Sequence, residues 1–273
     1  MLQGGGLGYE VSPSEVEAVK RLFASLSKAD AEAEAKKENV LGLLPLHMVA
    51  RFAEGRYAKE LFTAVFNAYP SAAKVDLGSH ALGYLPLHIV ARCMASKDGC
   101  VQAMQMLLAE YPEAALESTP SEGKRPLNLV AEYITEAAEA LEAIQLLLET
   151  CPQAAKEKQK DGWLPLHAVA RHMGGAEGLR AMQLLLKEHP QATKEKQKKG
   201  KLPIHCMCKN KKGTLDMVRE LLSAYPQSID EKDGNRRKPA AAARSNKCLP
   251  ADAIDFLRRA EQGKTKQRHR LSA

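Results

Sequence analysis

The sequence predicts an all-α solenoid of stacked antiparallel helix pairs, with a capping helix at each end. A block of the general form Gly-x-x-Pro-Leu-His recurs five times, beginning at Gly42, Gly83, Gly123, Gly162 and Gly200, and a worn sixth copy lies around Pro239. A second block, in which Tyr, Cys or His precedes Pro, keeps step with the first. Between the blocks, apolar residues recur at helical spacing. Two linked motifs in five copies indicate an internal repeat.

Each first block predicts the start of a helix. Proline suits the first helical turn, because its missing N–H costs nothing there and its φ is already helical. The glycine three residues earlier permits the turn that enters the helix. The interval between successive prolines falls from 41 residues (Pro45 to Pro86) to 36 (Pro203 to Pro239), so the repeats shorten along the chain.

A second helix follows in each repeat. Loop signals such as Lys97-Asp98-Gly99 precede a stretch in which Val101, Met104 and Leu108 lie at helical spacing. The closing Tyr-Pro, as at Tyr111-Pro112, ends this helix because the residue before proline avoids the α region. The predicted unit is helix, short loop, helix and a longer polar connection. One such pair cannot bury its own apolar face, so consecutive pairs should stack.

The ends of the chain predict three parts. Residues 1–38 are expected to form a flexible leader and an N-terminal capping helix, which the capping box Ser12-Pro13-Ser14-Glu15 opens. Residues 39–260 form the array of five clear repeats and a degenerate sixth, closed by a helix from Pro250 to about Ala260. Residues 261–273 have no apolar residue until Leu271, and we expect them to be a disordered basic tail.

These blocks resemble the ankyrin repeat over roughly residues 40–258: Pro-Leu-His opens the first of two helices, and a Leu-Leu-Leu run lies in the second. The chain departs from the family in three ways. The family has Thr before the Pro, whereas this chain has Leu44, Leu85, Arg125, Leu164 and Leu202. Tyr-Pro or its equivalents replace the family's left-handed Gly at the end of the second helix. The repeats also exceed the usual length of about thirty-three residues.

The resemblance implies a concave binding face made of loop tips and the exposed side of the first helix. Two contact positions per repeat follow from the alignment. The position two before the proline holds Leu43, Tyr84, Lys124, Trp163, Lys201 and Arg237. The position six after it holds Arg51, Arg92, Glu132, Arg171 and Lys209. With the lysines of residues 156–160 and 194–199, these residues predict a basic groove with Tyr84 and Trp163 as aromatic anchors, suited to an acidic partner segment.

Histidine and cysteine also need an interpretation. His47, His88, His167 and His205 share one slot, in which the third copy has Asn128. A catalytic residue has no reason to recur once per repeat, so we expect a side chain that hydrogen-bonds its local turn. Cys206 and Cys208 align with apolar core positions of the other copies, which favours buried thiols over a zinc site.

These features predict a non-catalytic interaction scaffold or adaptor that binds another protein, with no cofactor, metal, membrane or small-molecule substrate. No nucleophile elbow, paired-carboxylate signature or dinucleotide fingerprint occurs. The alternative is a nuclear or nucleic-acid-associated protein, because residues 231–273 hold twelve Lys/Arg against five Asp/Glu. A third is a cofactor-free enzyme, or a regulatory array severed from a catalytic partner, although no catalytic constellation supports activity in this chain itself. The scattered cysteines favour a reducing compartment, and we expect the cytoplasm, with the nucleus as the alternative.

Overall fold

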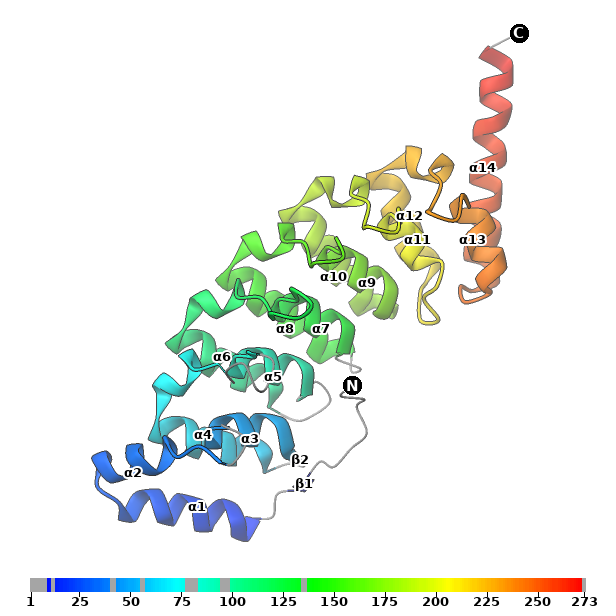
Figure 1. The fold of residues 1–273 in the computed structure, drawn as a ribbon. Helices are drawn as coiled ribbons and strands as arrows, with labels where there is room; N and C mark the ends of the chain where they lie inside the picture. Colours follow the sequence, from blue (N-terminus) through cyan, green and yellow to red (C-terminus); the bar gives the residue numbers. More distant parts are fainter. Residues whose placement is uncertain are drawn as a thin grey trace. The chain divides into compact units, whose positions relative to one another are not determined.

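The structure, a computed structural model, describes residues 9–10, 13–39, 43–54, 57–76, 83–93, 99–133 and 137–271. The chain divides into two units, Met1–Cys151 and Pro152–Ala273, called unit 1 and unit 2 below. Both consist of antiparallel helix pairs joined by short 3-10 helices (Figure 1). The predicted all-α solenoid is therefore confirmed, and no helix among the described residues is long and apolar enough to cross a membrane.

Unit 1 contains two N-terminal helices and three helix pairs. Its α-helices are α1 (Pro13–Ser25), α2 (Lys28–Ala35), α3 (Pro45–Phe52), α4 (Ala58–Ala68), α5 (Pro86–Cys93), α6 (Cys100–Glu110), α7 (Pro126–Tyr133) and α8 (Ala137–Thr150). The 3-10 helices are η1 (Pro70–Lys74) and η3 (Pro112–Ala115). Two-residue strands, β1 (Tyr9–Glu10) and β2 (Ala53–Glu54), pair in parallel. Successive first helices α3, α5 and α7 pack on one another, and α1 and α2 cover α4.

Unit 2 repeats the pattern. Its α-helices are α9 (Pro165–His172), α10 (Gly175–Glu188), α11 (Pro203–Met207), α12 (Leu215–Ala224), α13 (Pro239–Asn246) and α14 (Ala251–Leu271), and its 3-10 helices are η4 (Pro152–Lys156), η5 (Pro190–Lys194) and η6 (Pro226–Asp230). Helices α9, α11 and α13 stack in order, and α14 packs on α12 and α13. The core consists of Leu, Ala, Val, Ile and Met with few rings.

The C-terminal segment differs from its prediction. We expected a helix ending near Ala260 and disorder beyond it, whereas α14 continues to Leu271. No proline interrupts residues 251–271, and the Glu, Gln, Lys and Arg of this segment are good helix formers. The Glu261 carboxylate also lies 3.2 Å from the ammonium of Lys238, the N-cap residue of α13, which fixes the first turn of the extension.

The residues at the helix boundaries have the backbone conformations that the sequence predicted. Gly83, Gly123, Gly162 and Gly200 have φ between 59° and 83°, the left-handed region that glycine occupies without strain. In the worn sixth repeat Arg236 takes the same slot with φ 60°. Each second helix with a described C-cap ends at the residue before proline: at Tyr69, Tyr111, His189 and Tyr225, φ lies between −148° and −140° and ψ between 77° and 82°.

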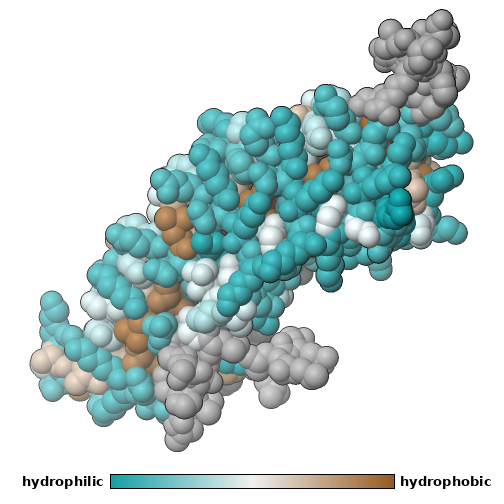
Figure 2. Space-filling model, turned by 45° about the horizontal axis from the view of Figure 1, so that its top comes forward, coloured by the Kyte–Doolittle hydropathy of each residue, from teal (hydrophilic) through white to brown (hydrophobic). Residues whose placement is uncertain are grey.

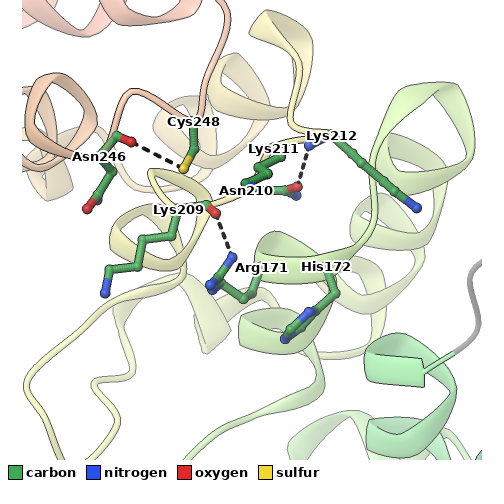
Figure 3. A pocket seen from close by; sticks show the side chains of 8 residues that line it. All are labelled: Arg171, His172, Lys209, Asn210, Lys211, Lys212, Asn246 and Cys248. Carbon is green, nitrogen blue, oxygen red and sulfur yellow. Dashed lines mark hydrogen bonds between the residues drawn. The ribbon is translucent and has the colours of Figure 1, made fainter. Parts of the chain in front are cut away.

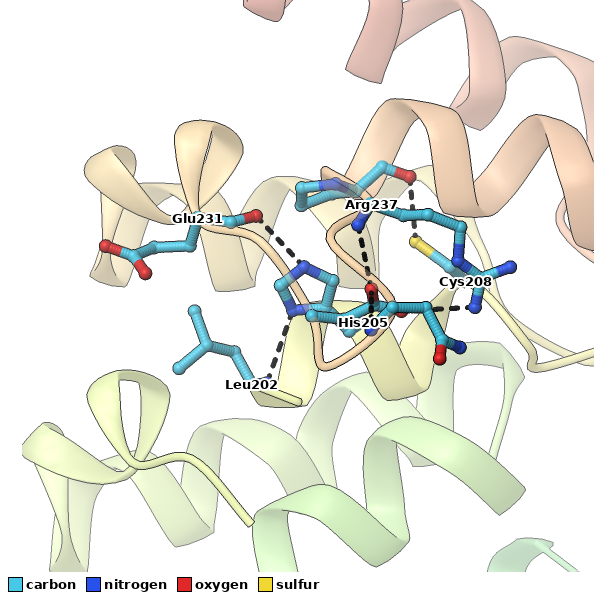
Figure 4. A network of polar contacts seen from close by, with 8 residues as sticks. Leu202, His205, Cys208, Glu231 and Arg237 are labelled. Atoms are coloured by element: carbon cyan, nitrogen blue, oxygen red, sulfur yellow. Dashed lines mark hydrogen bonds and ion pairs between the residues drawn. The ribbon is translucent and has the colours of Figure 1, made fainter. Parts of the chain in front are cut away.

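In four of the five clear repeats a histidine makes two hydrogen bonds, one within its own repeat and one to the next repeat. In unit 2, His205 Nδ1 accepts from the backbone N–H of Leu202 at 3.2 Å, and its Nε2 lies 3.1 Å from the carbonyl oxygen of Glu231 in the next repeat (Figure 4). Leucine before the proline has no side-chain acceptor, so the histidine supplies the N-terminal cap that Thr supplies in the family. The predicted bond to the local turn is therefore confirmed. The same pair of bonds occurs at His47, His88 and His167.

This pair of hydrogen bonds requires a neutral imidazole. Because Nδ1 accepts from an N–H group, it carries no proton, and Nε2–H donates to the carbonyl. All four rings are buried. Burial lowers the pKa of His88 and of His167 to about 4, against an ordinary 6.5, and the carbonyl partner only partly offsets it.

The connections between repeats end in tight turns that stack on one another. In unit 2, Gln197 N–H donates to Lys201 O at 3.0 Å and Gly200 N–H to Gln197 O at 2.8 Å, closing one turn. Each turn also touches the previous one, since Lys198 N–H donates to Asp161 O and Gly234 N–H to Lys199 O. The sequence predicted a polar connection here but not this pairing, nor the 3-10 helices that begin each connection.

Acid should weaken this fold through its histidines. With a folded-state pKa of about 4 against 6.5 unfolded, His88 and His167 take up protons first in the unfolded chain as the pH falls. Their stabilising effect is complete above pH 6.5 and is lost on the way to pH 4. We expect a loss of about 3 kcal/mol for each histidine, measured by urea unfolding across this range.

Other groups also titrate across this range, so the comparison uses His88→Asn/His167→Asn. Asparagine keeps the local bond, as Asn128 does with the backbone N–H of Arg125 at 3.2 Å, but it cannot be protonated. The variant should start less stable and lose less stability on acidification. An equal loss in both chains would contradict the assignment of the pH dependence to these rings.

Candidate functional site

The predicted contact positions of unit 1 point mostly inward. The Leu43 side chain is only 2% exposed. The Leu43 backbone N–H donates to the Asn39 side-chain oxygen, and the Leu43 carbonyl accepts from the Asn39 backbone N–H. The predicted contact role of Leu43 is therefore wrong, because a leucine at this place fills the core of the first repeat. Arg51 is half-buried, with its guanidinium 5.1 Å from the centroid of the Phe52 ring.

Tyr84 and Arg92 form a cluster with Tyr133. The Arg92 guanidinium donates to the Tyr84 hydroxyl at 3.1 Å and lies 5.0 Å from the centroid of the Tyr133 ring. Tyr84 is 7% exposed, so it is not the accessible anchor that the sequence predicted. Its ring instead packs 6.0 Å from that of His88, next to the helix start that His88 caps. Arg92 thus contacts Tyr84 in its own repeat and Tyr133 in the next repeat.

Lys124 is neutralised by its own repeat. Its ammonium lies 2.8 Å from Glu132 and 3.1 Å from Glu122, and the residue is 8% exposed. Burial alone would lower the pKa of Lys124, but the bonds and charges of Glu132 and then Glu122 raise it above its ordinary value. Lys124 is thus a buried ion-pair partner and not a free cation for a ligand. Opposite charges at the two contact positions of one repeat, Lys124 and Glu132, were the available sequence signal for this pair.

Unit 2 keeps its contact positions at the surface. Trp163 is half-buried; its ring lies 5.9 Å from that of His167, and its backbone N–H donates to the Asp161 carboxylate at 3.2 Å. One face of the indole therefore rests on the repeat while part of it stays accessible. This position allows both packing over the neighbouring loop and the predicted contact with a partner.

Arg171, Lys201 and Lys209 form the basic surface of unit 2. Arg171 Nη1 donates to the carbonyl of Lys209, and all three side chains are half-buried. Burial, and then the neighbouring Lys209 ammonium, hold the pKa of Lys201 below its ordinary value. Among the described residues none of the three forms an ion pair, in contrast to Lys124. Like charges are thus held together without a carboxylate between them.

The nearby carboxylates are engaged elsewhere. Asp161 accepts from Trp163, and Asp233 accepts from the backbone N–H groups of Asn235 and Arg237 and pairs with the Arg237 guanidinium at 3.1 Å. Arg237, which shares the slot of Trp163 and Lys201, is therefore committed to its own turn. Figure 2 shows that the face in view is mainly hydrophilic over unit 2, as expected of a surface recognised through charge.

Part of the predicted basic loop is also neutralised. Lys158 lies 2.7 Å from Glu195, and Lys196 lies 2.7 Å from Glu231, so each lysine pairs with the glutamate of the next repeat. These pairs are exposed and contribute little stability each. Lys158 and Lys196 are therefore neutralised and do not add positive charge to the predicted groove. Arg171, Lys201 and Lys209 remain as its cations in unit 2.

The cysteines of the His-Cys-Met-Cys segment belong to the core. Cys206 and Cys208 are buried, and burial raises the pKa of each thiol to about 12. The Cys208 thiol donates to the Pro239 carbonyl in the next repeat at 3.3 Å (Figure 4). These contacts confirm the predicted core positions. No group of three or more His, Cys, Asp or Glu residues with metal-binding geometry occurs in the described parts of the chain.

A buried asparagine that the sequence reading missed positions the loop after α11. Asn210 Nδ2 donates to the carbonyls of Ala170 and Met173 at the end of α9, and its Oδ1 accepts from Lys212 N–H at 2.8 Å. The loop that carries Lys209 is thereby fixed against the preceding repeat. Lysines stand on both sides of this residue, so nothing in the sequence marked it as buried.

Comparison with known proteins agrees with the repeat architecture. A family model for ankyrin repeats, in three copies, matches residues 133–233, which include the basic surface of unit 2. No curated protein matches the sequence.

The close approach behind this surface can be tested at Gly174. A Cβ added there would overlap the carbonyl oxygen and Cβ of Lys212. We expect Gly174→Ala to destabilise the protein by about 1–3 kcal/mol, measured by thermal unfolding. Gly263→Ala is the matched control: no atom lies within 4 Å of its added Cβ, and a helical alanine should stabilise by up to about 1 kcal/mol. Equal melting temperatures for the two variants would contradict this packing.

Proposed function

We propose, from the premise that residues 133–233 of this chain are ankyrin repeats, that the protein is a non-catalytic adaptor whose unit 2 binds an acidic segment of another protein. Ankyrin repeats generally mediate protein–protein interaction and are typically not catalytic. A repeat fold supports many partners, so the argument for this one comes from its surface.

The observation that carries the proposal is the difference in charge pairing between the two units. The equivalent slots hold Lys124 paired with two glutamates in unit 1, whereas in unit 2 Lys201 and Lys209 form no ion pair among the described residues, although the Asp233 carboxylate still acts on Lys201 through its charge. Holding two ammonium groups together costs free energy that an incoming carboxylate would recover. Structural needs do not explain this arrangement, since the same repeat positions accept a neutral pair.

The same surface offers the two kinds of contact that protein recognition uses. Trp163 supplies a rigid apolar side chain that is already oriented against His167. The cations give long-range attraction and fix the register of an acidic segment, an effect that salt screens. The partner expected from this chemistry is an extended segment with acidic residues beside an apolar one.

The histidines supply no evidence for catalysis. Each of the four repeat histidines uses both ring nitrogens within the fold, and burial keeps the rings neutral. A general acid or base needs a ring nitrogen within reach of a substrate proton. The recurrent histidines therefore support a scaffold and not an acid–base site.

The proposal is tested with Trp163→Ala/Lys201→Gln, compared with wild type in quantitative affinity capture from lysate with nuclease present. We expect the partner proteins to fall by at least about tenfold in the variant, because hot-spot residues account for most of the binding energy. Higher salt should lower capture by the wild type.

The control variant is Leu22→Ala/Lys187→Gln, which removes an exposed apolar side chain and an exposed lysine elsewhere. It should capture the partners as the wild type does, and circular dichroism should show both variants folded. Partners captured equally by all three chains would contradict the assignment of this surface. Material that disappears with nuclease in every sample would favour the basic C-terminal segment and nucleic acid.

A further inference from the structure

Beside the basic surface, unit 2 has a cavity of about 340 Å³. Figure 3 shows that Arg171 and His172 line it from the end of α9, residues 209–212 from the loop after α11, and Asn246 and Cys248 from the end of α13. Three consecutive repeats therefore contribute to it. Its size lies at the lower end of the range for small-molecule and side-chain pockets, which is about 300–1,000 Å³.

The lining carries positive charge and no acid. Arg171, Lys209, Lys211 and Lys212 line the cavity, and neither Asp nor Glu does. In the described part of the chain no carboxylate pairs with any of the four. The helix dipole favours a cation such as Arg171 in the last turn of α9, but Lys211 and Lys212 lie in a loop beyond the end of α11. The helix dipole therefore does not account for the positions of Lys211 and Lys212.

A buried donor lies behind this lining. Asn246 Nδ2 has no hydrogen-bond partner among the described residues and is out of the reach of water, so a ligand in the open cavity does not contact it directly. Asn210 occupies the same repeat slot one repeat earlier, where its Nδ2 donates to two carbonyls at the end of α9. Asn246 therefore lacks the bonds that fix its counterpart.

The frame of the cavity is already fixed. One Arg171 nitrogen donates to the Lys209 carbonyl, which orients the guanidinium and leaves its other N–H groups for a ligand. Asn210 fixes the loop on both sides by bonding the end of α9 and the Lys212 N–H. The Lys209 and Lys212 side chains extend to opposite sides of the opening (Figure 3). The oriented guanidinium and the fixed loop backbone reduce the entropy lost when an anion binds, whereas the exposed Lys211 and Lys212 side chains must still be ordered.

We propose that this cavity binds a phosphate monoester on a serine or threonine side chain of the partner protein. Such a group carries nearly two negative charges and three acceptor oxygens, which match several cations better than one carboxylate does. The inference rests on the proposed function and adds to it: the acidic partner segment would be phosphorylated, and the cavity would be where its phosphate lies.

The test uses the ¹⁵N-labelled full chain and a short peptide with one phosphoserine among glycines and alanines. Titration should shift the amide signals of residues 209–213 and the Asn246 side-chain amide. Lys211→Gln/Lys212→Gln should weaken binding at least about tenfold, because two charge-assisted contacts are lost. Asn246→Asp should weaken it as well, since it adds a negative charge to the lining of the cavity. Lys187→Gln/Lys232→Gln, which removes two exposed lysines elsewhere, should bind as the wild type does.

Three further probes decide the source of the anion. Equal binding of the unphosphorylated peptide or of a glutamate peptide would overturn the phosphate assignment. Inorganic phosphate binding as tightly as the phosphopeptide would overturn the partner-protein source, and tighter binding of single-stranded DNA through these residues would point to nucleic acid instead. If the cavity variants lose phosphopeptide binding while the wild type captures no protein, the proposed function fails and the anion site stands. If proteins are captured without any phosphate dependence, only the phosphate inference fails.

Discussion

The buried neutral imidazole that four of the five clear repeats contain is the interaction on which the rest of the structure depends. One ring nitrogen satisfies the first N–H of a helix and the other satisfies a carbonyl of the next repeat, so one side chain links local structure to stacking. Asn128 makes only the first of these two bonds. Its Oδ1 caps the helix start, but its Nδ2 is buried and has no hydrogen-bond partner among the described residues. Because the histidine does the capping, the residue before the proline can be an apolar core residue such as Leu164.

The fold could be predicted because its signals are local. Pro165 marks a helix start, Gly162 a positive φ and the residue before a proline a helix end, and each follows from backbone sterics within a few residues. The second bond of each histidine could not be predicted, because it depends on how far one repeat lies from the next. The end of α14 was misplaced for a related reason: low hydrophobicity suggested disorder, whereas helix propensity and the Lys238–Glu261 contact favour the helix.

The candidate site was only partly predictable, since one alignment column holds residues in different surroundings. Leu43 is buried, Lys124 is ion-paired and Trp163 is partly accessible, although all three lie two residues before a proline. Burial and pairing depend on neighbours such as Glu122 and Tyr133 that the column does not contain. In unit 1 Leu43 and Lys124 are committed to the fold, whereas in unit 2 Lys201 and Lys209 form no ion pair among the described residues and Arg237 pairs with Asp233.

The most direct test of this account is the protonation state of the histidine rings, measured by long-range ¹H–¹⁵N NMR as the pH is lowered. At neutral pH the account predicts that His88 and His167 carry their proton on Nε2 with Nδ1 as acceptor, and that the rings stay neutral until the pH approaches 4. A proton on Nδ1, or titration near the ordinary pKa of about 6.5, would contradict it. Either result would mean that the repeats are not joined through these rings.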